Sequence, residues 1–292
     1  DWSSDVCSSD LFEGTANGTV TAGPAGSGTG PYAFTVTVGG DGILSFATAI
    51  GAITDTADIE SAASNTITVF VDQTAPVVPG APEVELRSGL SFGAGKVPVT
   101  VSWHDAVDAG AGLDATKPYR LEVQLGTGDW TLVAETAGTV VQTTLPGGAS
   151  ARFRVRAIDK LGNVAYGEAT TPRSATVVPE STKAIKYTGT WKTANVKAYG
   201  GGSARYATKT GSSASYAFVG RGAAIVMAKA PGRGKVTIWL DGVKVATYSL
   251  AGPAKTSYIV WQATWGQAGS HTVKIVSASN ARIDFDGVIR LE

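Results

Sequence analysis

The sequence contains few of the residues that usually carry covalent or metal chemistry. Its 292 residues include one cysteine, Cys7, and two histidines, His104 and His271. A single thiol cannot form an internal disulfide, and neither histidine has a second histidine or cysteine nearby, which disfavours a zinc site. No apolar run approaches the ~18 residues of a membrane-spanning helix, and no hydrophobic signal segment is visible at the start.

Long helices are also disfavoured. The 37 glycines and 12 prolines interrupt the chain about every six residues, whereas an ordinary helix needs a longer stretch without such breaks. Many of the intervening runs alternate apolar with polar residues, which is typical of short, half-buried strands joined by turns. We therefore predict an all-β protein.

Residues 1–11 are treated separately from the rest of the chain. They resemble the conceptual translation of a sequencing-library adapter, and we exclude them from the fold prediction. Cys7 lies in this stretch, so the remaining chain has no cysteine. The natural N-terminus is then absent, and we expect the chain to be part of a longer polypeptide.

A formal net charge of zero hides a gradient along the chain. Residues 12–73 contain six acidic residues and no lysine or arginine. Residues 74–176 contain ten acidic and nine basic residues, whereas residues 177–292 contain five acidic and fifteen basic residues. The opposite charges at the two ends favour different partners or an attraction between the ends.

Residues 12–73 predict a series of strands and turns. The alternating run Tyr32–Val38, a turn at Gly39–Gly42 and the run Ile43–Phe46 predict a hairpin. Residues 51–76 contain Gly-Ala-Ile-Thr-Asp, Ser-Asn-Thr and Val-Asp-Gln-Thr-Ala-Pro, and they resemble the end of bacterial immunoglobulin-like repeats of large adhesins. The resemblance implies a β-sandwich, which usually needs about 100 residues. We expect this segment to be a truncated repeat and the least stable part of the chain.

Residues 74–176 begin with a proline-rich joint and predict a second sandwich. Alternation places Val97, Val99, Val101 and Trp103 on one face of a strand, and Tyr119, Leu121, Val123 and Leu125 on one face of another. The run from Phe153 to Asn163 reads Phe-Arg-Val-Arg-Ala-Ile-Asp-Lys-Leu-Gly-Asn, and it resembles the signature of fibronectin type III-like modules. A second joint is predicted at residues 171–180.

Residues 177–292 predict a third module. Asp241-Gly242 between two alternating runs predicts a hairpin with a type I′ turn. The segment resembles a C-terminal jelly-roll module of secreted bacterial proteins, related to galactose-binding or carbohydrate-binding jelly rolls. The residues that carry the resemblance are Tyr187–Trp191, Gly201–Ser203, Gly211, Phe218, Gly220, Pro231–Lys235, Asp241-Gly242, Gly269–Thr272 and Ile283–Gly287.

Aromatic and basic residues of this last segment are candidates for a carbohydrate site, because sugar rings stack on exposed aromatic faces. Alternation places Trp239 on the outer face of its strand, and Trp265 precedes a glycine at a predicted loop edge. We add Arg233 and Tyr206 as polar and aromatic candidates. The alternative is that these aromatic side chains are buried core residues.

Acidic loop residues are candidates for structural calcium, which prefers a cage of six to eight oxygen ligands. In the first segment the candidates are Asp55, Asp58, Glu60 and Asp72. A second, looser acidic loop contains Asp105, Asp108 and Asp114. The alternative is that all of these are solvated loop side chains, and no other cofactor is predicted.

The residues Gly89–Gly93 match Gly-x-Ser-x-Gly, but this motif is catalytic only at a strand-to-helix turn with a histidine base. Gly95 and Pro98 prevent a helix there, so we predict a loop and no catalytic residue. Arg152, Arg154 and Arg156 share one strand face, where they either pair with Glu122 across strands or contact an anion.

The sequence therefore predicts three consecutive β-sandwiches, at residues 12–73, 74–176 and 177–292, in a non-catalytic extracellular region of a bacterial protein. The first two would act as spacers, and the third would bind a polysaccharide or cell-wall glycan, with anionic glycans among the options. Nucleic acid is not an expected partner. The alternatives are a purely structural stalk of an adhesin and the accessory modules of a secreted hydrolase.

Overall fold

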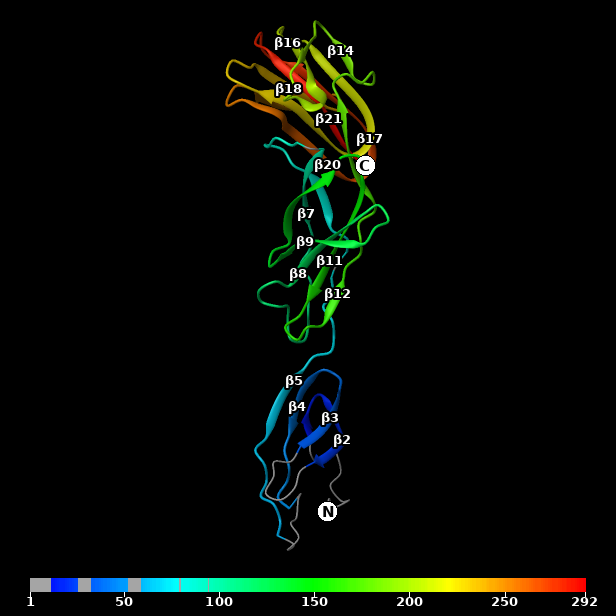
Figure 1. The fold of residues 1–292 in the computed structure, drawn as a ribbon, viewed down its shortest axis with the longest axis vertical. Coiled ribbons are helices and arrows are strands. Elements are labelled where there is room, and N and C mark those ends of the chain that lie inside the picture. Colours follow the sequence, from blue (N-terminus) through cyan, green and yellow to red (C-terminus); the bar gives the residue numbers. More distant parts are fainter. Residues whose placement is uncertain (1–11, 26–32, 52–58, 79, 94) are drawn as a thin grey trace. The chain divides into compact units, whose positions relative to one another are not determined.

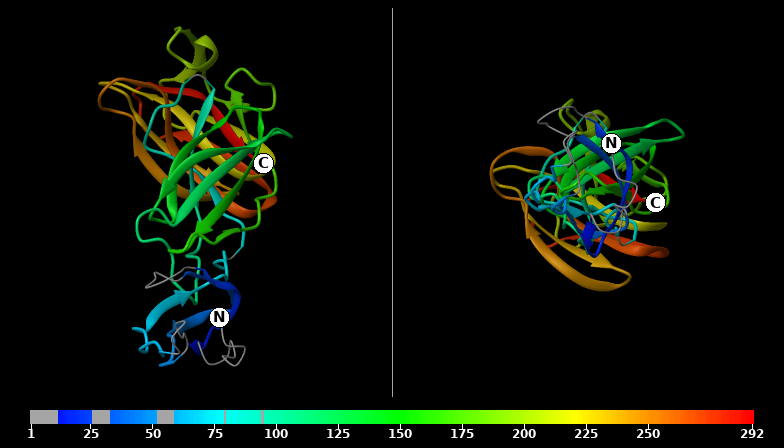
Figure 2. Two further views of the ribbon diagram at one scale, coloured as in Figure 1. Left: turned by 60° about the horizontal axis from the view of Figure 1, so that its bottom comes forward. Right: turned by 90° about the horizontal axis from the view of Figure 1, so that it is seen from below.

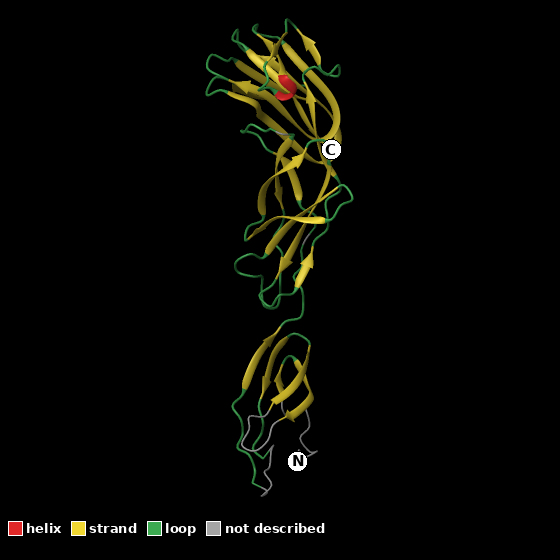
Figure 3. Ribbon diagram, viewed as in Figure 1, coloured by secondary structure: helices red, strands yellow, loops and turns green. Residues whose placement is uncertain are grey.

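The structure is a computed structural model that describes residues 12–25, 33–51, 59–78, 80–93 and 95–292. Within these residues nearly every regular element is a strand, and the one helical element is a short 3-10 turn at Gly200–Gly202 (Figure 3). The predicted all-β fold is confirmed. None of the described helical residues forms a segment long and apolar enough to cross a membrane.

The chain forms two compact units that are interleaved in sequence. Unit 1 contains the chain up to Val78 together with Ala106–Pro118 and Arg156–Tyr166. Unit 2 contains Pro79–Asp105, Tyr119–Val155 and Gly167–Glu292. Parts of the predicted middle segment thus belong to each unit, and the predicted division into three segments stays a prediction.

Unit 1 has two small sheets in its first part. β1 (Phe12–Gly14), β4 (Gly42–Phe46) and β5 (Ile67–Val71) form one sheet in the order β1-β4-β5, and β2 (Asn17–Ala25) pairs with β3 (Ala33–Gly39). The predicted hairpin is therefore wrong, because its two strands pair with different partners. Gly40 and Gly42, at φ 77° and 135°, let the chain pass between the sheets.

The first part of unit 2 contains the strands predicted for the middle segment, and most residues predicted to face inward are buried. β6 (Glu83–Leu86), β7 (Lys96–Ser102) and β10 (Val140–Pro146) form one sheet, and β8 (Tyr119–Leu125), β9 (Trp130–Thr136) and β11 (Ser150–Ile158) belong to another. Val97, Val99 and Val101 are buried, and Trp103 meets Tyr119 edge-on at 5.7 Å between ring centroids. Leu125, at the end of its predicted face, is exposed. The end of β11, from Arg156 onward, belongs to unit 1, where the short strand β12 (Val164–Tyr166) pairs with it.

The predicted joint at residues 171–180 is a strand. β13 (Arg173–Pro179) pairs with β11 at Ser174 and with β21 (Ile283–Leu291) along most of its length. The loop after β6 also forms a hydrogen bond with residues 177–292, which we call the jelly roll, because the Gly89 N–H donates to the Ile259 carbonyl at 2.8 Å. The prediction of a linker here is wrong, since these backbone hydrogen bonds join the two parts of unit 2.

The last part of unit 2 is built on two long strands, β17 (Ser213–Lys229) and β20 (Lys255–Ser277). One sheet runs in the order β19-β18-β20-β17-β14, with β18 (Lys235–Leu240), β19 (Val243–Ser249) and β14 (Lys186–Thr188). The second half of β17 also pairs with β21, which pairs with β16 (Ser203–Ala207), and β15 (Lys192–Asn195) pairs with β16. Figures 1 and 2 show the β18–β19 hairpin beside β20. Its turn at Asp241 and Gly242 has positive φ at both residues, as a type I′ turn requires.

Candidate functional site

A row of side chains crosses the outer face of the sheet β19-β18-β20-β17-β14. The strand register places its five members directly opposite one another: Lys244, Trp239, Lys274, Ser215 and Lys186. Residues that lie opposite one another in antiparallel strands point to the same face. We call these residues the Trp239 row.

The alternation along each strand shows that this face is the outer one. Ile238 and Ile275, the neighbours of Trp239 and Lys274, belong to the hydrophobic core, whereas Trp239 is half-buried outside that core. The three lysines of the row are exposed. Because neighbouring strands lie about 4.8 Å apart, the row spans about 19 Å from Lys244 to Lys186. It presents one aromatic ring between two cations, with a third cation two strands further along.

The surface around the row is more basic than the composition alone indicates. Of the five acidic residues in 177–292, three are buried: Glu180, Asp284 and Asp286. The remaining two are paired with basic side chains: Asp241 with His271 and Glu292 with Arg290, with 2.8 Å between the paired atoms in each case. The fifteen basic residues of this segment therefore set the sign of the surface potential.

Trp265 lies in a different environment from Trp239. The predicted loop edge is wrong, because Trp265 lies within β20, where it is half-buried and packs against the core. Its ring stacks on the His271 ring, with 3.8 Å between the centroids and 8° between the planes. His271 also lies in β20 and not in a turn, and its Nδ1 is 2.8 Å from Asp241 Oδ2. This hydrogen bond is the main cause that lowers the pKa of Asp241.

Arg233 and Tyr206 both lie near the fully buried carboxylate of Asp284. Arg233 pairs with this carboxylate, and Tyr206 contacts Arg282, which also pairs with it. Arg233 Nε lies 2.7 Å from Asp284 Oδ2, and Arg282 bonds to Oδ1 while its guanidinium lies 3.9 Å from the centre of the Tyr206 ring. Tyr199 donates its hydroxyl to Oδ1 at 3.2 Å. Burial first, and the Asp284 charge second, raise the pKa of Tyr199. The buried carboxylate thus fixes both guanidiniums, and the four predicted binding residues are divided among three places.

A pocket of about 600 Å³ lies elsewhere in unit 2. Three segments line it: the loop after β6, the loop before β16 and the start of β20. Its lining residues are Ser91, Phe92, Gly93, Gly95, Ala198, Tyr199, Gly200, Gly201, Ala254, Lys255, Thr256 and Ser257. The sequence prediction missed this pocket, because even the nearest two of its three segments are more than fifty residues apart and only Gly201 among the lining residues carried a family resemblance.

A buried carboxyl group, that of Asp286, bonds to the pocket wall. Its Oδ2 accepts hydrogen bonds from the Gly200 N–H at 3.2 Å and from the Ser257 hydroxyl at 3.0 Å. Its Oδ1 is buried and has no hydrogen-bond partner among the described residues. Burial outweighs the two hydrogen bonds and raises the pKa of Asp286 to about 6.

The predicted calcium ligands fall partly outside the described residues. Asp55 and Asp58 lie there, and Glu60 is exposed. Asp72 is buried in unit 1, where its carboxylate and those of Asp108 and Asp159 offer oxygen atoms within 4.8 Å of one another. Only the fold could bring these three together, since they are far apart in sequence. Calcium at Asp72 stays a prediction.

Hydrogen bonds already occupy the oxygens of this acidic cluster. Asp72 accepts the backbone N–H groups of Thr74 and Ala111, and Asp159 accepts those of Leu161 and Asn163. Burial alone would raise the pKa of Asp159, but these bonds and one from the Asn163 side chain lower it overall. Backbone and amide hydrogen bonds thus hold the buried Asp72 and Asp159 side chains in place.

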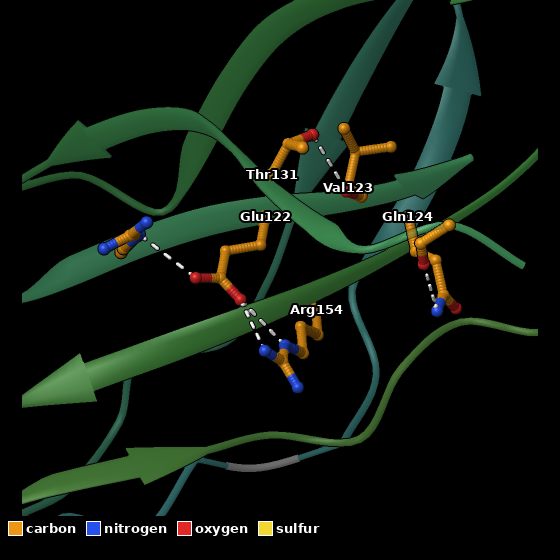
Figure 4. Close-up of polar contacts among 7 residues, drawn as sticks. Glu122, Val123, Gln124, Thr131 and Arg154 are labelled. Carbon is orange, nitrogen blue, oxygen red and sulfur yellow. Dashed lines mark hydrogen bonds and ion pairs between the residues drawn. The ribbon is translucent and has the colours of Figure 1, made fainter.

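One arginine of the stripe, Arg154, pairs with an acid across strands, as one of the two interpretations predicted. Its guanidinium lies 2.8 Å from the carboxylate of the buried Glu122 (Figure 4). Arg120, in the same strand as Glu122, lies 3.1 Å from this carboxylate. The Arg154 guanidinium also lies 4.3 Å from the centre of the Trp130 ring. The Gly89–Gly93 loop lies against β20, where Ser91 forms an isolated bridge with Tyr258.

No family model matches the chain. Over 127 residues it is 27% identical to the A type blood N-acetyl-alpha-D-galactosamine deacetylase of Flavonifractor plautii, a match of 44% of this chain and 16% of that protein. Over 111 residues it is 31% identical to the A type blood alpha-D-galactosamine galactosaminidase of the same organism, a match of 38% of this chain and 10% of that protein. The chain thus spans a small part of these curated relatives.

Similar solved structures include a family two carbohydrate esterase from Cellvibrio japonicus, at a TM-score of 0.32 and 16% identity, covering 41% of this chain and 34% of that one. Another is the CBM36-1 domain of a multidomain xylanase from the hindgut metagenome of Trinervitermes trinervoides. It has a TM-score of 0.31 and 18% identity, and the match covers 40% of this chain and 95% of that one. TM-scores of this size assign neither fold nor function.

Proposed function

We propose that this chain is a non-catalytic, glycan-binding region of a larger extracellular bacterial protein. The observation that carries the proposal is the Trp239 row, in which a half-buried indole on the outer sheet face lies between Lys244 and Lys274. The C–H face of a sugar ring stacks on an aromatic ring, and ammonium groups donate hydrogen bonds to hydroxyl or carboxylate oxygens. A row across a sheet contacts several sugar units of one chain.

The indole N–H of Trp239 favours a role for this ring beyond packing. It is buried and has no hydrogen-bond partner among the described residues. A buried donor without a partner costs about 1–3 kcal/mol of folding free energy. The ring also lies outside the hydrophobic core. A tryptophan at this position is therefore consistent with a ligand that stacks on its ring.

The curated relatives support an accessory role. They are named for two different reactions on A type blood group sugars, and the matches cover only 16% and 10% of their lengths. Similarity to small parts of two enzymes that are named for different reactions is more consistent with an accessory role than with catalysis. The other parts of the chain would then space the module that carries the Trp239 row from the rest of the protein, in a wall glycan, a matrix or an adhesin.

The proposal is tested by affinity electrophoresis of the full chain in gels that contain neutral polysaccharides (galactan, xylan) or anionic ones (polygalacturonate, hyaluronan). We expect retardation that Trp239→Ala weakens about tenfold or more, equivalent to ~1.4 kcal/mol of binding free energy. Trp130→Ala is the matched control, because Trp130 lies in β9 beneath Arg154 and outside the row.

Salt separates stacking from simple charge attraction. Lys244→Gln with Lys274→Gln should weaken binding to anionic gels at low salt, because exposed cations act through screened charge. Retardation that high salt abolishes and that Trp239→Ala leaves unchanged would contradict the proposal, and so would the absence of retardation in every gel. Either result would favour a structural stalk.

A further inference from the structure

The pocket beside Asp286 shares no residue with the Trp239 row. Its volume of about 600 Å³ falls within the range of sites for small ligands, about 300–1,000 Å³. Residues 91–93 and Gly95 line one part of it, and a backbone hydrogen bond holds this segment against β20, because the Phe92 N–H donates to the Ser257 carbonyl at 3.1 Å. The pocket is therefore a composite of the two parts of unit 2.

Gly200 leaves room in the pocket wall next to the carboxyl group of Asp286. The three atoms nearest to a Cβ built on Gly200 all belong to this carboxyl group, and the first is Oδ1 at 3.3 Å. Oδ1 has no hydrogen-bond partner among the described residues. The carboxyl group therefore lies against the Gly200 backbone at this wall, where it holds the Gly200 N–H and the Ser257 hydroxyl by hydrogen bonds and adds a negative charge when ionised.

A strained residue holds the other side of this carboxyl group. Ser257 has φ 46°, in the left-handed region that a residue with a side chain rarely adopts. Its hydroxyl donates to Asp286 Oδ2, and its backbone lines the pocket. Strain of this kind is typical of ligand-binding sites, where the surrounding structure enforces an unfavourable conformation.

The charges around the pocket select among ligand classes. Asp286 lies behind one wall, and the exposed Lys255 lies in the lining. An anion would be repelled by the carboxylate, and a cation would be repelled by the ammonium group. A hydroxyl group both donates and accepts hydrogen bonds, so a polyhydroxylated neutral ligand complements both charges. Phe92 and Tyr199 are the aromatic residues among those that line the pocket.

We infer that this pocket binds one neutral sugar residue, at the end of a glycan chain. A flat face such as the Trp239 row accepts the middle of a chain, whereas a pocket of this size accepts a terminal unit. The chain then has two glycan contacts of different kinds. The inference goes beyond the proposed function, because neither site uses residues of the other.

The test is ligand-observed saturation-transfer NMR on the full chain with methyl glycosides of galactose, N-acetylgalactosamine, glucose and xylose. We expect at least one glycoside to bind. Gly200→Ala adds a methyl group at 3.3 Å from Asp286 Oδ1 and should weaken binding about tenfold or more, because this wall of the pocket must shift to accommodate it. Gly266→Ala is the matched control, because a Cβ there meets no atom within 4 Å.

Lys255→Gln tests the pocket from its exposed side and does not disturb Asp286. It should weaken binding several-fold while leaving the near-UV circular dichroism spectrum unchanged. The inference is overturned if no glycoside binds, or if binding is unaffected by both Gly200→Ala and Lys255→Gln. It is also overturned if Trp239→Ala abolishes the signal, which would place the bound glycoside at the row. If no polysaccharide gel retards the chain but a methyl glycoside still binds, the proposed function is overturned and the inference about the pocket is not.

Discussion

The first segment and the jelly roll contain strands of similar pattern but bury them to very different degrees. In the described part of residues 12–78, the nonpolar side chains that are buried are Ala16, Leu44 and Pro76, and three residues of β5, Ile67, Val69 and Phe70, are about half exposed or more. In the jelly roll, side chains from β17, β18, β20 and β21 form one continuous core. Alternation thus produces strands in both regions, but only a covered face provides much hydrophobic stabilisation.

The two regions also differ in how they hold acidic groups. Asp41 in the first segment accepts hydrogen bonds from the Thr74 hydroxyl and the Gln73 N–H, in that order of effect, and these lower its pKa. Asp286 in the jelly roll is buried, which raises its pKa to about 6. An exposed turn between two sheets can therefore stabilise a charged carboxylate, whereas burial in the packed module makes the charged form of Asp286 unfavourable.

The largest expected effect is the loss of a core side chain. Phe285→Ala removes a ring that is 2% exposed in the jelly-roll core, and we expect a loss of about 3–5 kcal/mol of unfolding free energy. Leu44→Ala should cost clearly less, because the described part of residues 12–78 buries few nonpolar side chains. Urea unfolding followed by tryptophan fluorescence measures the first, since the tryptophans from Trp103 onward all lie in unit 2. Circular dichroism measures both. Equal losses would contradict the comparison.

The second-largest expected effect is a pH dependence of the unfolding free energy, with opposite signs in the two regions. Since the folded pKa of Asp286 is about 6 and its ordinary value is 3.8, the folded state binds its proton more tightly. Stability should therefore be highest below pH 4 for this group and fall as the pH rises to above 6, by about 3 kcal/mol at most. Asp41 has a lowered pKa, so its contribution is present above its ordinary pKa and is lost as the pH falls.

Asp286→Asn isolates the first of these trends. Unfolding midpoints in urea at pH 5 and pH 8 should show a smaller decrease with pH for the variant than for the unaltered chain. Asp41→Asn, the control in the other region, should leave the unfolding of unit 2 unchanged at both values. An unaltered pH slope in Asp286→Asn would show that another group carries the dependence.

The smallest effect is expected on the uncovered face of β5. Val69 is 52% exposed, so Val69→Thr should change the unfolding free energy by less than about 0.5 kcal/mol. The matched variant in the jelly roll is Val236→Thr, at a side chain with no exposure, which should cost several times more. Hydrogen exchange of unit 1 detects the first change. A large loss from Val69→Thr would mean that another surface covers this strand.

Several local predictions were confirmed because they depend on neighbouring residues alone. The Asp241-Gly242 turn and the inward valines of β7 follow from turn chemistry and from the two-residue period of a strand. The hairpin at residues 32–46 was wrong because strand pairing depends on partners elsewhere in the chain. Residues 171–180 contain two prolines and still form β13, since Pro179 lies at the end of that strand and Pro172 precedes it.

The candidate sites also combine features that neighbouring residues determine with features that depend on distant parts of the chain. Trp239 could be placed on an outer face from alternation, but its lysine neighbours come from strand register, which a single strand does not encode. Trp265 was expected at a loop edge because a glycine follows it, but the strand continues through Gly266. No local pattern marks the contact between Gly200 and Asp286, which lie 86 residues apart.

The sequence by itself determined the all-β class, the polarity of most strand faces and the basic character of the last segment, because these depend on composition and on a period of two residues. Only the tertiary structure decided which strands pair and that β13 joins the middle part of unit 2 to the jelly roll. It also decided that three segments far apart in sequence line one pocket. These features depend on contacts between residues far apart in sequence, where burial and hydrogen bonding outweigh local preference.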